Sequence, residues 1–403
     1  MKILYITQYF PPEIGAGAVR AFNISNCLSG LEHKVRIISE IPNYPDGKIA
    51  EKYRNRILYN EKFKGITVLR TYACASNRDT FLKKMLFYLS FMISSCVGAL
   101  CCKKPDLIIA TSPPLPVALT GYFISRVKKT KLLLDIRDIW PDSAVAVGAL
   151  RNRTILYFIS KKLERFLYNR ANLITSSVYG LCERIRKSTK TPVFHLPNAV
   201  LLTDFKPGYH GDRIKQKYGL NGKFIVLYSG NHGLAQGLEF ILQSALLLKR
   251  FEDILFLFVG EGVKKAYLEE QKRGLGLNNV TFLGKKPHKE MPDIINISNV
   301  CLVPLKKNEL FLNALPSKIL EYMALQKPII LSVKGEAEKL LKDADAGISI
   351  EPEDSEKLSE AILKLYRNPE LCRLFGENGY KYIKNFYSHQ NQFTSCKELL
   401  KSL

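Results

Sequence analysis

The chain has 403 residues, of which 46% are hydrophobic and 24% are charged, and its formal net charge is +23. This length exceeds what one ordinary α/β core holds, so it predicts two domains of roughly 200 residues each. The composition is that of a globular protein and excludes long disordered or low-complexity segments.

The positive charge is concentrated in the first half of the chain. Residues 1–200 contain 31 Lys+Arg against 13 Asp+Glu, a net of +18, whereas residues 201–403 contain 29 against 24, a net of +5. This excess predicts that the first half meets an anionic partner, such as a membrane surface. Nucleic acid is the alternative, but the basic residues are scattered singly or in pairs without a recognition-helix pattern, so we expect no nucleic acid partner.

The cysteines and the first residues predict where the chain folds. None of the nine cysteines forms a C-x-x-C pair, and most lie in apolar segments, which indicates a reducing compartment and no zinc site. The start, MKILYITQYFPPE, is a short apolar run ended by two prolines and lacks the long apolar region of a signal peptide. We therefore expect a first β-strand and a cytoplasmic protein.

Short apolar runs alternate with helix-length segments throughout the chain. Those of the first half are 2–7, 34–39, 106–110, 131–136 and 172–177, and those of the second half are 224–229, 254–259, 280–284, 300–305 and 328–332. Buried strands with helical crossovers form parallel sheets covered on both faces. The sequence thus predicts an α/β protein of two doubly wound, Rossmann-like domains, with the boundary near the turn-rich segment 196–212.

Residues 85–102, MLFYLSFMISSCVGALCC, form an uncharged run between Lys83–Lys84 and Lys103–Lys104. Eighteen residues are at the lower limit for crossing a bilayer. Its serines and glycine, and the domain sequence that continues on both sides, favour a buried or surface-docked crossover helix over a spanning one. A helix lying in the membrane interface also agrees with the basic first half.

Glycine-rich turns follow the first strand of each predicted domain. PPEIGAGAVR places Gly15 and Gly17 after the first strand, and YSGNHGLAQGLEFI places Gly230, Gly233 and Gly237 after the strand at 224–229. Such turns can admit phosphate, although a plain strand-to-helix connection explains each one as well. Arg20 replaces the third glycine of G-x-G-x-x-G, which argues against a dinucleotide site at the first turn.

The segment NELFLNALPSKILEYMALQKPIILS, residues 308–332, contains the polar side chains best placed to bind a nucleotide. Pro316 suits a first helical turn, which places Glu321 inside a helix that runs to about Leu325. A carboxylate there can accept two ribose hydroxyls, and Ser317 and Lys318 can meet phosphate. A single helical glutamate taken alone is more often part of a solvated face.

These segments, together with PNAV at 197–200, VGEG at 259–262 and LLLDIRDIWPDSAVAVG at 132–148, resemble the family 4 retaining glycosyltransferases of the GT-B fold, in the same order along the chain. The RD-x-WP-[DE]-S and PSK-x-x-EYMA segments are most similar to those of bacterial O-antigen and capsule enzymes such as N-acetyl-L-fucosamine transferases. The resemblance covers nearly the whole chain. It implies two domains facing across a cleft, with a C-terminal helix that returns to the first domain.

The resemblance also implies the roles of the domains. Residues 1–200 would bind the acceptor and face the membrane, residues 201–375 would bind the nucleotide sugar, and residues 376–403 would pack back towards the first domain. Glu321 would bind the donor ribose. The loop of Gly15, Ala16 and Gly17 would close on the donor diphosphate, with the turn from Gly230 to Gly237 on the other side. The donor base would be bordered by Gly260, Glu261 and the loop from Gly284 to Lys286, and the catalytic position would fall on Arg137 and Asp138, with Asp138 touching a sugar.

The chain departs from the family pattern at three positions. Asn313 replaces the first acid of E-x7-E, and Asn231 and Gln236 replace the Arg and Lys that grip the diphosphate in many members. The charge of the leaving group would then be met by Lys318, Arg20, Lys285 or Lys286 and by backbone N–H groups.

These features predict transfer of an N-acetylated or deoxy hexose from UDP to a polyprenyl-diphosphate-linked saccharide, without cofactor or metal. The D-x-D at Asp343–Asp345 is typical of a solvated turn. Two alternatives remain. A nucleotide-sugar 2-epimerase needs carboxylates and a histidine around the sugar, and only His232 and His288 lie near predicted donor loops. A non-catalytic partner of an active transferase is favoured by Asn231, Gln236 and Asn313.

Overall fold

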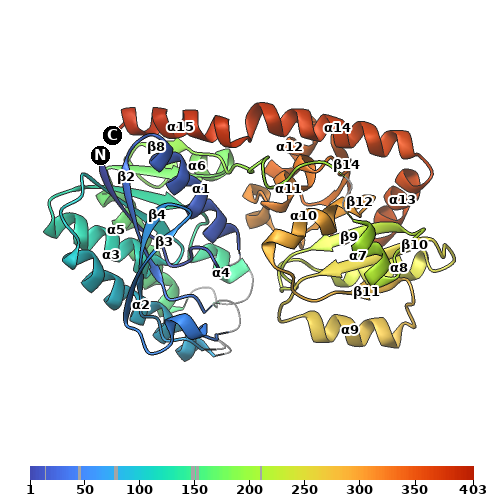
Figure 1. Ribbon diagram of the computed structural model, residues 1–403, viewed down its shortest axis with the longest axis horizontal. Coiled ribbons are helices and arrows are strands. Elements are labelled where there is room, and N and C mark those ends of the chain that lie inside the picture. Colours follow the sequence, from blue (N-terminus) through green and yellow to red (C-terminus); the bar gives the residue numbers. More distant parts are fainter. Residues whose placement is uncertain (14, 44–46, 77–79, 147–149, 151–153, 209–210) are drawn as a thin grey trace. The chain divides into compact units, whose positions relative to one another are not determined.

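The computed structural model describes the chain except residues 14, 44–46, 77–79, 147–149, 151–153 and 209–210 (Figure 1). Residues 147–148 of the predicted catalytic segment and 209–210 of the predicted boundary therefore lie outside the described residues. The chain divides into two compact units, Met1–Ala199 with His389–Leu403, and Val200–Ser388.

The first unit is built on an eight-stranded sheet of order β3-β4-β2-β1-β5-β6-β7-β8. All its neighbouring strands are parallel except β3, which pairs antiparallel with β4. The strands are β1 (Lys2–Ile6), β2 (Lys34–Glu40), β3 (Leu58–Phe63), β4 (Ile66–Thr71), β5 (Leu107–Ser112), β6 (Lys131–Ile136), β7 (Leu173–Ser176) and β8 (Val193–His195). Every residue of β5 is buried, as expected for a central parallel strand covered on both faces.

Helices cover both faces of this sheet (Figure 1). They are α1 (Ala16–Gly30), α2 (Phe81–Cys101), α3 (Leu115–Val127), α4 (Asp142–Ala146), α5 (Ile155–Arg170), α6 (Tyr179–Arg186) and α15 (His389–Lys401), with the 3-10 helix η1 (Glu51–Tyr53). The Thr80 hydroxyl caps α2 by accepting the N–H of Lys83. The α2 helix packs on α3, β2 and β4, and α3 packs in turn on α5.

The second unit has a six-stranded, all-parallel sheet of order β11-β10-β9-β12-β13-β14. Its strands are β9 (Phe224–Ser229), β10 (Ile254–Val259), β11 (Val280–Phe282), β12 (Val300–Pro304), β13 (Ile329–Ser332) and β14 (Gly347–Ser349). Successive residues of β9 enter opposite cores, because Ile225 and Leu227 pack into one and Val226 and Tyr228 into the other. This sheet is therefore buried between two helical layers.

One layer contains α8 (Glu239–Leu247), α9 (Lys265–Gly274) and α13 (Ser355–Tyr366), whose apolar residues share a core with Val226. The other contains α10 (Met291–Asn296), α11 (Lys318–Ala324), α12 (Glu336–Asp343) and α14 (Pro369–Phe386), whose apolar residues share a core with Ile225. The unit also has α7 (Asp212–Tyr218), η2 (His288–Glu290) and η3 (Glu309–Asn313).

The predicted boundary at residue 376 was wrong. The α14 helix stays with the second unit, because Gly376 lies against the carbonyl of Gln326 and Gly379 against Met323. Only α15 joins the first unit, where Phe393 packs on Gly30 of α1 and the Gln392 amide donates to the carbonyl of Pro197. The chain changes units at 199–200 and again at 388–389.

Candidate active site

Two glycine turns meet at the carboxyl ends of β9 and β10. The amide of Gly230 donates to the Val259 carbonyl at 2.8 Å, and the amide of Gly260 donates to the Gly284 carbonyl at 2.9 Å. A Cβ on Gly260 would stand 1.8 Å from the carbonyl oxygen of Gly230, so only glycine permits this approach. The carboxyl ends of parallel strands are where doubly wound sheets bind ligands.

The turn after β9 is braced by its own side chains. The Gly233 amide donates to the Gln236 side-chain oxygen at 3.1 Å, and a Cβ on Gly233 would stand 2.6 Å from the amide nitrogen of Asn231. The helix α8 begins only at Glu239, well past these residues. Asn231 and Gln236 therefore fix the shape of the turn and bring no positive charge to it.

The helix α11 starts at Lys318, follows Ser317 and ends at Ala324, as the sequence predicted to within a residue or two. Its first turn carries Glu321, whose side chain is about a quarter exposed at 23%. The side chain of Lys318 extends towards the β9 turn, and its Nζ lies 4.1 Å from the centroid of the Tyr228 ring. The first turn of α11 thus brings the ammonium group of Lys318 to the β9 turn and carries the carboxylate of Glu321 three residues further along the helix.

Two neighbours of these groups, His288 and Tyr228, were not predicted to be donor-site residues, although His288 was expected near a donor loop. His288 Nε2 lies 3.8 Å from a carboxylate oxygen of Glu321, and the ring of His288 packs edge-on against Phe205. Tyr228 supplies the ring under Lys318 and donates its hydroxyl to the carbonyl of Asn231 at 2.6 Å. The positions of glycines and charges in the sequence do not reveal either contact, since both residues come from separate strands and loops.

The loop after β11 is tied to other parts of the second unit. Lys286 donates to the hydroxyl of Tyr218 at 2.8 Å, and this ammonium lowers the pKa of Tyr218. Glu261 forms an ion pair with Lys265 at 2.6 Å beside Gly284. Lys285 is exposed at the same loop. These residues lie at the strand ends as expected, with Lys286 and Glu261 already engaged by protein partners.

Asn313 and the D-x-D segment lie at the ends of two helices of the second unit, η3 and α12. Asn313 is the last residue of η3 and is part-buried. Asp343 ends α12, and Asp345 has a φ of 43° and accepts a hydrogen bond from the Asn378 amide. The described residues contain no group of three or more His, Cys, Asp or Glu side chains placed to hold a metal ion.

In the first unit, Arg137 follows β6 and reaches the start of α1. A Cβ on Gly17 would stand 2.1 Å from an Nη of Arg137, so the guanidinium occupies the space that a side chain at 17 would take. Arg137 donates to the Pro113 carbonyl at 3.2 Å, and among the described residues its Nε finds no acceptor. Burial lowers the pKa of Arg137 despite the nearby Asp135. The structure therefore brings Gly17 and Arg137 together, beside the exposed Gly15 and Ala16.

Asp138 is the next residue and is exposed. One carboxylate oxygen accepts the N–H of Ile139 at 2.8 Å. Partial removal from water raises the pKa of Asp138, and the hydroxyl of Ser143 opposes this shift. A carboxylate with a raised pKa at the end of a parallel strand is suited to contact a polar substrate.

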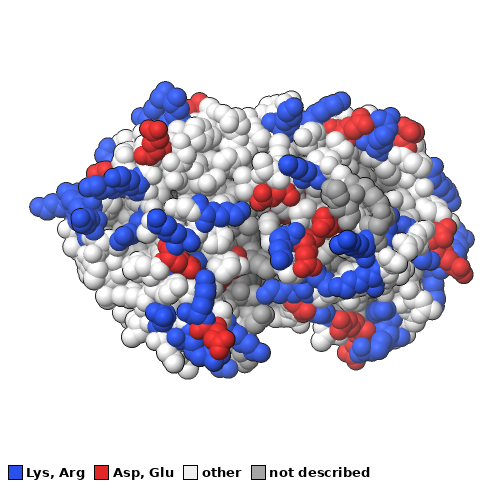
Figure 2. Space-filling model, viewed as in Figure 1, with Lys and Arg blue, Asp and Glu red and all other residues white. Residues whose placement is uncertain are grey.

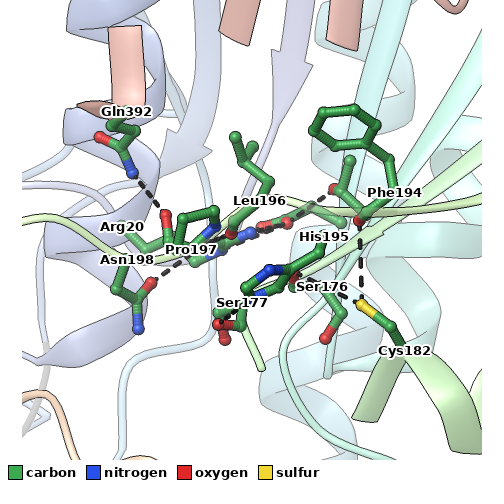
Figure 3. A network of polar contacts seen from close by, with 12 residues as sticks. Arg20, Ser176, Ser177, Cys182, Phe194, His195, Leu196, Pro197, Asn198 and Gln392 are labelled. Carbon is green, nitrogen blue, oxygen red and sulfur yellow. Dashed lines mark hydrogen bonds and ion pairs between the residues drawn. The ribbon is translucent and has the colours of Figure 1, made fainter. Parts of the chain in front are cut away.

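Arg20 does not belong to a phosphate site, which corrects the expectation from the sequence. Its guanidinium forms a buried ion pair with Asp135 at 2.6 Å. It also donates to the carbonyl of Leu196 and to the side chain of Asn198, both at 2.9 Å (Figure 3). Only 3% of its side chain is exposed. Arg20 thus holds the segment that leads into the second unit through its bonds to Leu196 and Asn198. Its charge is already balanced by Asp135 on β6.

The comparisons with known proteins agree with this geometry. The model of the family described as glycosyl transferases group 1 matches residues 211–382. Those residues are a group 1 glycosyl transferase domain. The chain is 27% identical over 392 residues to the putative colanic acid biosynthesis glycosyl transferase WcaI of Escherichia coli, covering 94% of this chain and 96% of that protein. It is 25% identical to the capsular polysaccharide biosynthesis glycosyltransferase CapM of Staphylococcus aureus, covering 86% and 85%.

Solved structures show the same fold. Sucrose-phosphate synthase from Thermosynechococcus elongatus has a TM-score of 0.79 with 16% identity, covering 99% of this chain and 98% of that one. HepE of Anabaena, solved with UDP and glucose, has a TM-score of 0.76 with 16% identity and full coverage of both chains. The protein is a glycosyltransferase of the GT-B fold, and the predictions of fold and enzyme class are confirmed.

Proposed function

We propose that the protein transfers an N-acetylated or deoxy hexose from a UDP-sugar to a polyprenyl-diphosphate-linked saccharide, with retention at the anomeric carbon, in bacterial O-antigen or capsule synthesis. The observation that carries the proposal is the first turn of α11, which brings the ammonium group of Lys318 to Gly230 of the β9 turn and also carries Glu321. The relatives' names point to surface polysaccharides, and HepE was solved with UDP-glucose.

In this proposal the second unit binds the nucleotide. Glu321 accepts the two ribose hydroxyls, and the turn at Gly230 admits the diphosphate against backbone N–H groups. Gly260, Glu261 and the loop with Lys285 border the base. Charge on the departing diphosphate is met by lysine and by backbone donors, without metal.

The first unit would supply the acceptor side. Asp138 is the group that contacts a sugar hydroxyl, and Arg137 beside Gly17 presents a guanidinium to anionic oxygen. The departing phosphate would take the proton of the acceptor hydroxyl. Each proton and charge is thereby assigned to a group of this chain or of its substrates.

The test is transfer by the purified full chain. A panel of UDP-sugars is incubated with a synthetic prenyl-diphosphate saccharide, and the product is examined by NMR for its anomeric configuration. We expect one donor to react, with retention. A change in the sugar of the donor alone would instead favour the 2-epimerase, and absence of both reactions with every donor would favour a non-catalytic partner.

We also propose that the first unit docks on the cytoplasmic face of an anionic membrane. The supporting observation is a set of exposed apolar side chains on three helices that pack in sequence, α2, α3 and α5. They are Leu82, Leu86, Ile93, Val97 and Leu100 on α2, Phe123 and Val127 on α3, and Ile155, Phe158 and Ile159 on α5. Lysines 83, 84, 103 and 104 are exposed at the two ends of α2. Figure 2 shows Lys and Arg side chains spread over the visible face of this unit.

Within the described residues, α2 is the single helix long and apolar enough to cross a membrane, over Leu82–Cys101. Only 28% of this apolar stretch is buried inside the protein. Its inner face is attached to the sheet, because Gly98 lies against Leu69 and Thr71, and the Ser94 hydroxyl donates to the Tyr72 carbonyl. Crossing the bilayer would break these contacts. A position in the interface keeps them and places the lysines at the lipid headgroups.

Vesicle sedimentation tests the docking. We expect binding to vesicles that contain phosphatidylglycerol, weaker binding at high salt, and loss of binding when Lys83, Lys84, Lys103 and Lys104 become Glu. Phe158→Ser with Ile159→Ser should weaken binding at any salt concentration, since it removes inserted apolar area. Equal binding to neutral vesicles in all variants would contradict the proposal.

A further inference from the structure

The turn after β9 carries no lysine or arginine, although a diphosphate placed there would bring negative charge. Apart from the buried His232, its polar side chains are Asn231 and Gln236, which both lie against Gly233. Lys286 donates to the hydroxyl of Tyr218, and the charge of Arg20 is balanced by Asp135 in the other unit. The compensating charge must therefore come from outside the turn.

Lys318 brings an ammonium group to the first residue of the turn, Gly230, whereas Lys306 lies against its last residue, Gly237. The Nζ of Lys318 lies 2.8 Å from the point where a Cβ of Gly230 would stand, and 4.1 Å from the centre of the Tyr228 ring. Gly230 has a φ of 133°, a conformation that glycine favours, and any side chain there would displace the lysine. The first residue of the turn and Lys318 thus fit one another.

Lys318 has no close counter-ion in the part of the chain that the structure describes. No carboxylate there lies within 4.0 Å of its Nζ, and the next acid along α11, Glu321, lies 3.8 Å from His288. A partly buried ammonium held only by an aromatic face is incompletely compensated, so an arriving anion gains a strong interaction there.

We propose that Lys318 is the cation that receives the donor diphosphate, in place of a basic pair in the turn, and that nucleotide binding draws a proton from solution onto Lys318. This inference rests on the proposed UDP-sugar site. It adds the uptake of one proton to the binding reaction, and it names Lys318 as the residue that compensates the negative charge of the diphosphate.

The surroundings explain why the proton is taken up on binding. Burial lowers the pKa of Lys318 to about 7, and the more distant charges of Glu321 and Cys301 only partly oppose this. The other titratable groups that face it are Tyr228 below the ammonium and the neutral His232 of the turn. At pH 8 the free site is therefore mostly neutral, and a bound diphosphate restores the charged form.

Calorimetry of the full chain with UDP at pH 8 tests this inference. At this pH the terminal phosphate of UDP is ionised, because its pKa is ~6. Titrations in Hepes, Tricine and Tris, which differ in ionisation enthalpy, report the protons taken up. We expect about 0.9 proton per UDP for the wild type, which follows from a pKa one unit below the pH. Affinity should fall roughly 50-fold between pH 7 and 9, apart from the ionisation of uracil, because the charged fraction of a free group with a pKa of about 7 falls from about one half to about 0.01.

Lys318→Met should bind UDP at least about tenfold more weakly and take up no proton. Lys384→Met, at an exposed lysine of α14, should keep both the affinity and the uptake of the wild type. UDP binding by the wild type without proton uptake, or uptake that persists in Lys318→Met, would overturn the role of Lys318 and leave the donor site standing. Failure of the wild type to bind UDP would instead remove the proposed function itself. The wild-type titration decides the matter even if the variant does not fold.

Discussion

The guanidinium of Arg137 fills the space that a side chain at Gly17 would need, since a Cβ at position 17 would stand 2.1 Å from a guanidinium nitrogen. Arg137, the first residue after β6, can therefore take this position only because residue 17 of α1 is a glycine. Arg137 keeps an Nε without an acceptor among the described residues, which suits it to receive an anionic oxygen.

Gly17→Ala should move Arg137 and lower kcat/KM by roughly 10- to 100-fold, as expected for a displaced positioning group. The fold should persist, because only the guanidinium end of a long side chain must shift. The matched control is Gly274→Ala, where a Cβ meets no atom within 4 Å. Steady-state kinetics with the identified donor provide the measurement, and an unchanged kcat/KM in Gly17→Ala would contradict a role for Arg137.

Arg20→Met should reduce the stability of the first unit without weakening nucleotide binding. It leaves Asp135 buried without its partner, which typically costs about 3–5 kcal/mol. Arg186→Met removes an exposed pair with Glu183 and should cost about 1 kcal/mol or less. Denaturant unfolding gives the two losses, and calorimetry at low temperature gives the UDP affinity.

The companion variant Arg20→Met with Asp135→Leu should recover part of the stability, because no unpaired charge remains. A large loss of UDP affinity in well-folded Arg20→Met would show that Arg20 contacts the nucleotide after all.

The predictable part of the fold is the part that patterning specifies. The ten strands given by apolar runs are present, but the hairpin of β3 and β4 was missed. β3 alternates exposed and half-buried residues and lies at a sheet edge, so it shows no continuous apolar run. β8 and β14 have three residues each, too few for a period. The Lys64–Gly65 turn, with φ values of 45° and 86°, was the available signal for the hairpin.

The placement of the candidate site residues in the fold was predictable where one short segment carries them, as in α11 and the glycine turns. It was not predictable where partners are far apart in sequence. Arg20 was assigned to phosphate because its partner Asp135 lies 115 residues away, and a charge pattern cannot reveal that pairing. The contact of His288 with Glu321 likewise depends on how two loops of the second unit meet.

Glu321→Gln should weaken UDP binding through the ribose. Each hydrogen bond to a charged acceptor contributes about 1.5–3 kcal/mol, so the dissociation constant should rise roughly 10- to 100-fold. The wild type should prefer UDP over 2′-deoxy-UDP, and Glu321→Gln should lose most of that preference. Glu309→Gln, at an exposed acid of η3, serves as the control. A full preference for ribose in Glu321→Gln would exclude the assignment.

His232 should make the stability of the protein depend on pH. Its ring is fully buried among Tyr228, Phe258 and Phe282, and neither ring nitrogen has a hydrogen-bond partner among the described residues. Burial lowers the pKa of His232 from 6.5 to about 4, which the charge of Glu261 only partly opposes. Between these values the unfolded chain binds a proton that the folded chain does not.

Stability from this group is therefore complete above pH 6.5 and falls by up to ~3 kcal/mol as the pH is lowered to 4. His232→Phe removes the titrating group and keeps an aromatic ring in the cluster, so its free energy of unfolding should change less over this window. The measurement is urea unfolding at several pH values. His33→Gln is the comparison and should change the slope less than His232→Phe does, because the pKa of His33 is also lowered but its side chain is only part-buried. Equal slopes in the wild type and His232→Phe would mean that His232 gains a hydrogen-bonded or charged form in the folded protein.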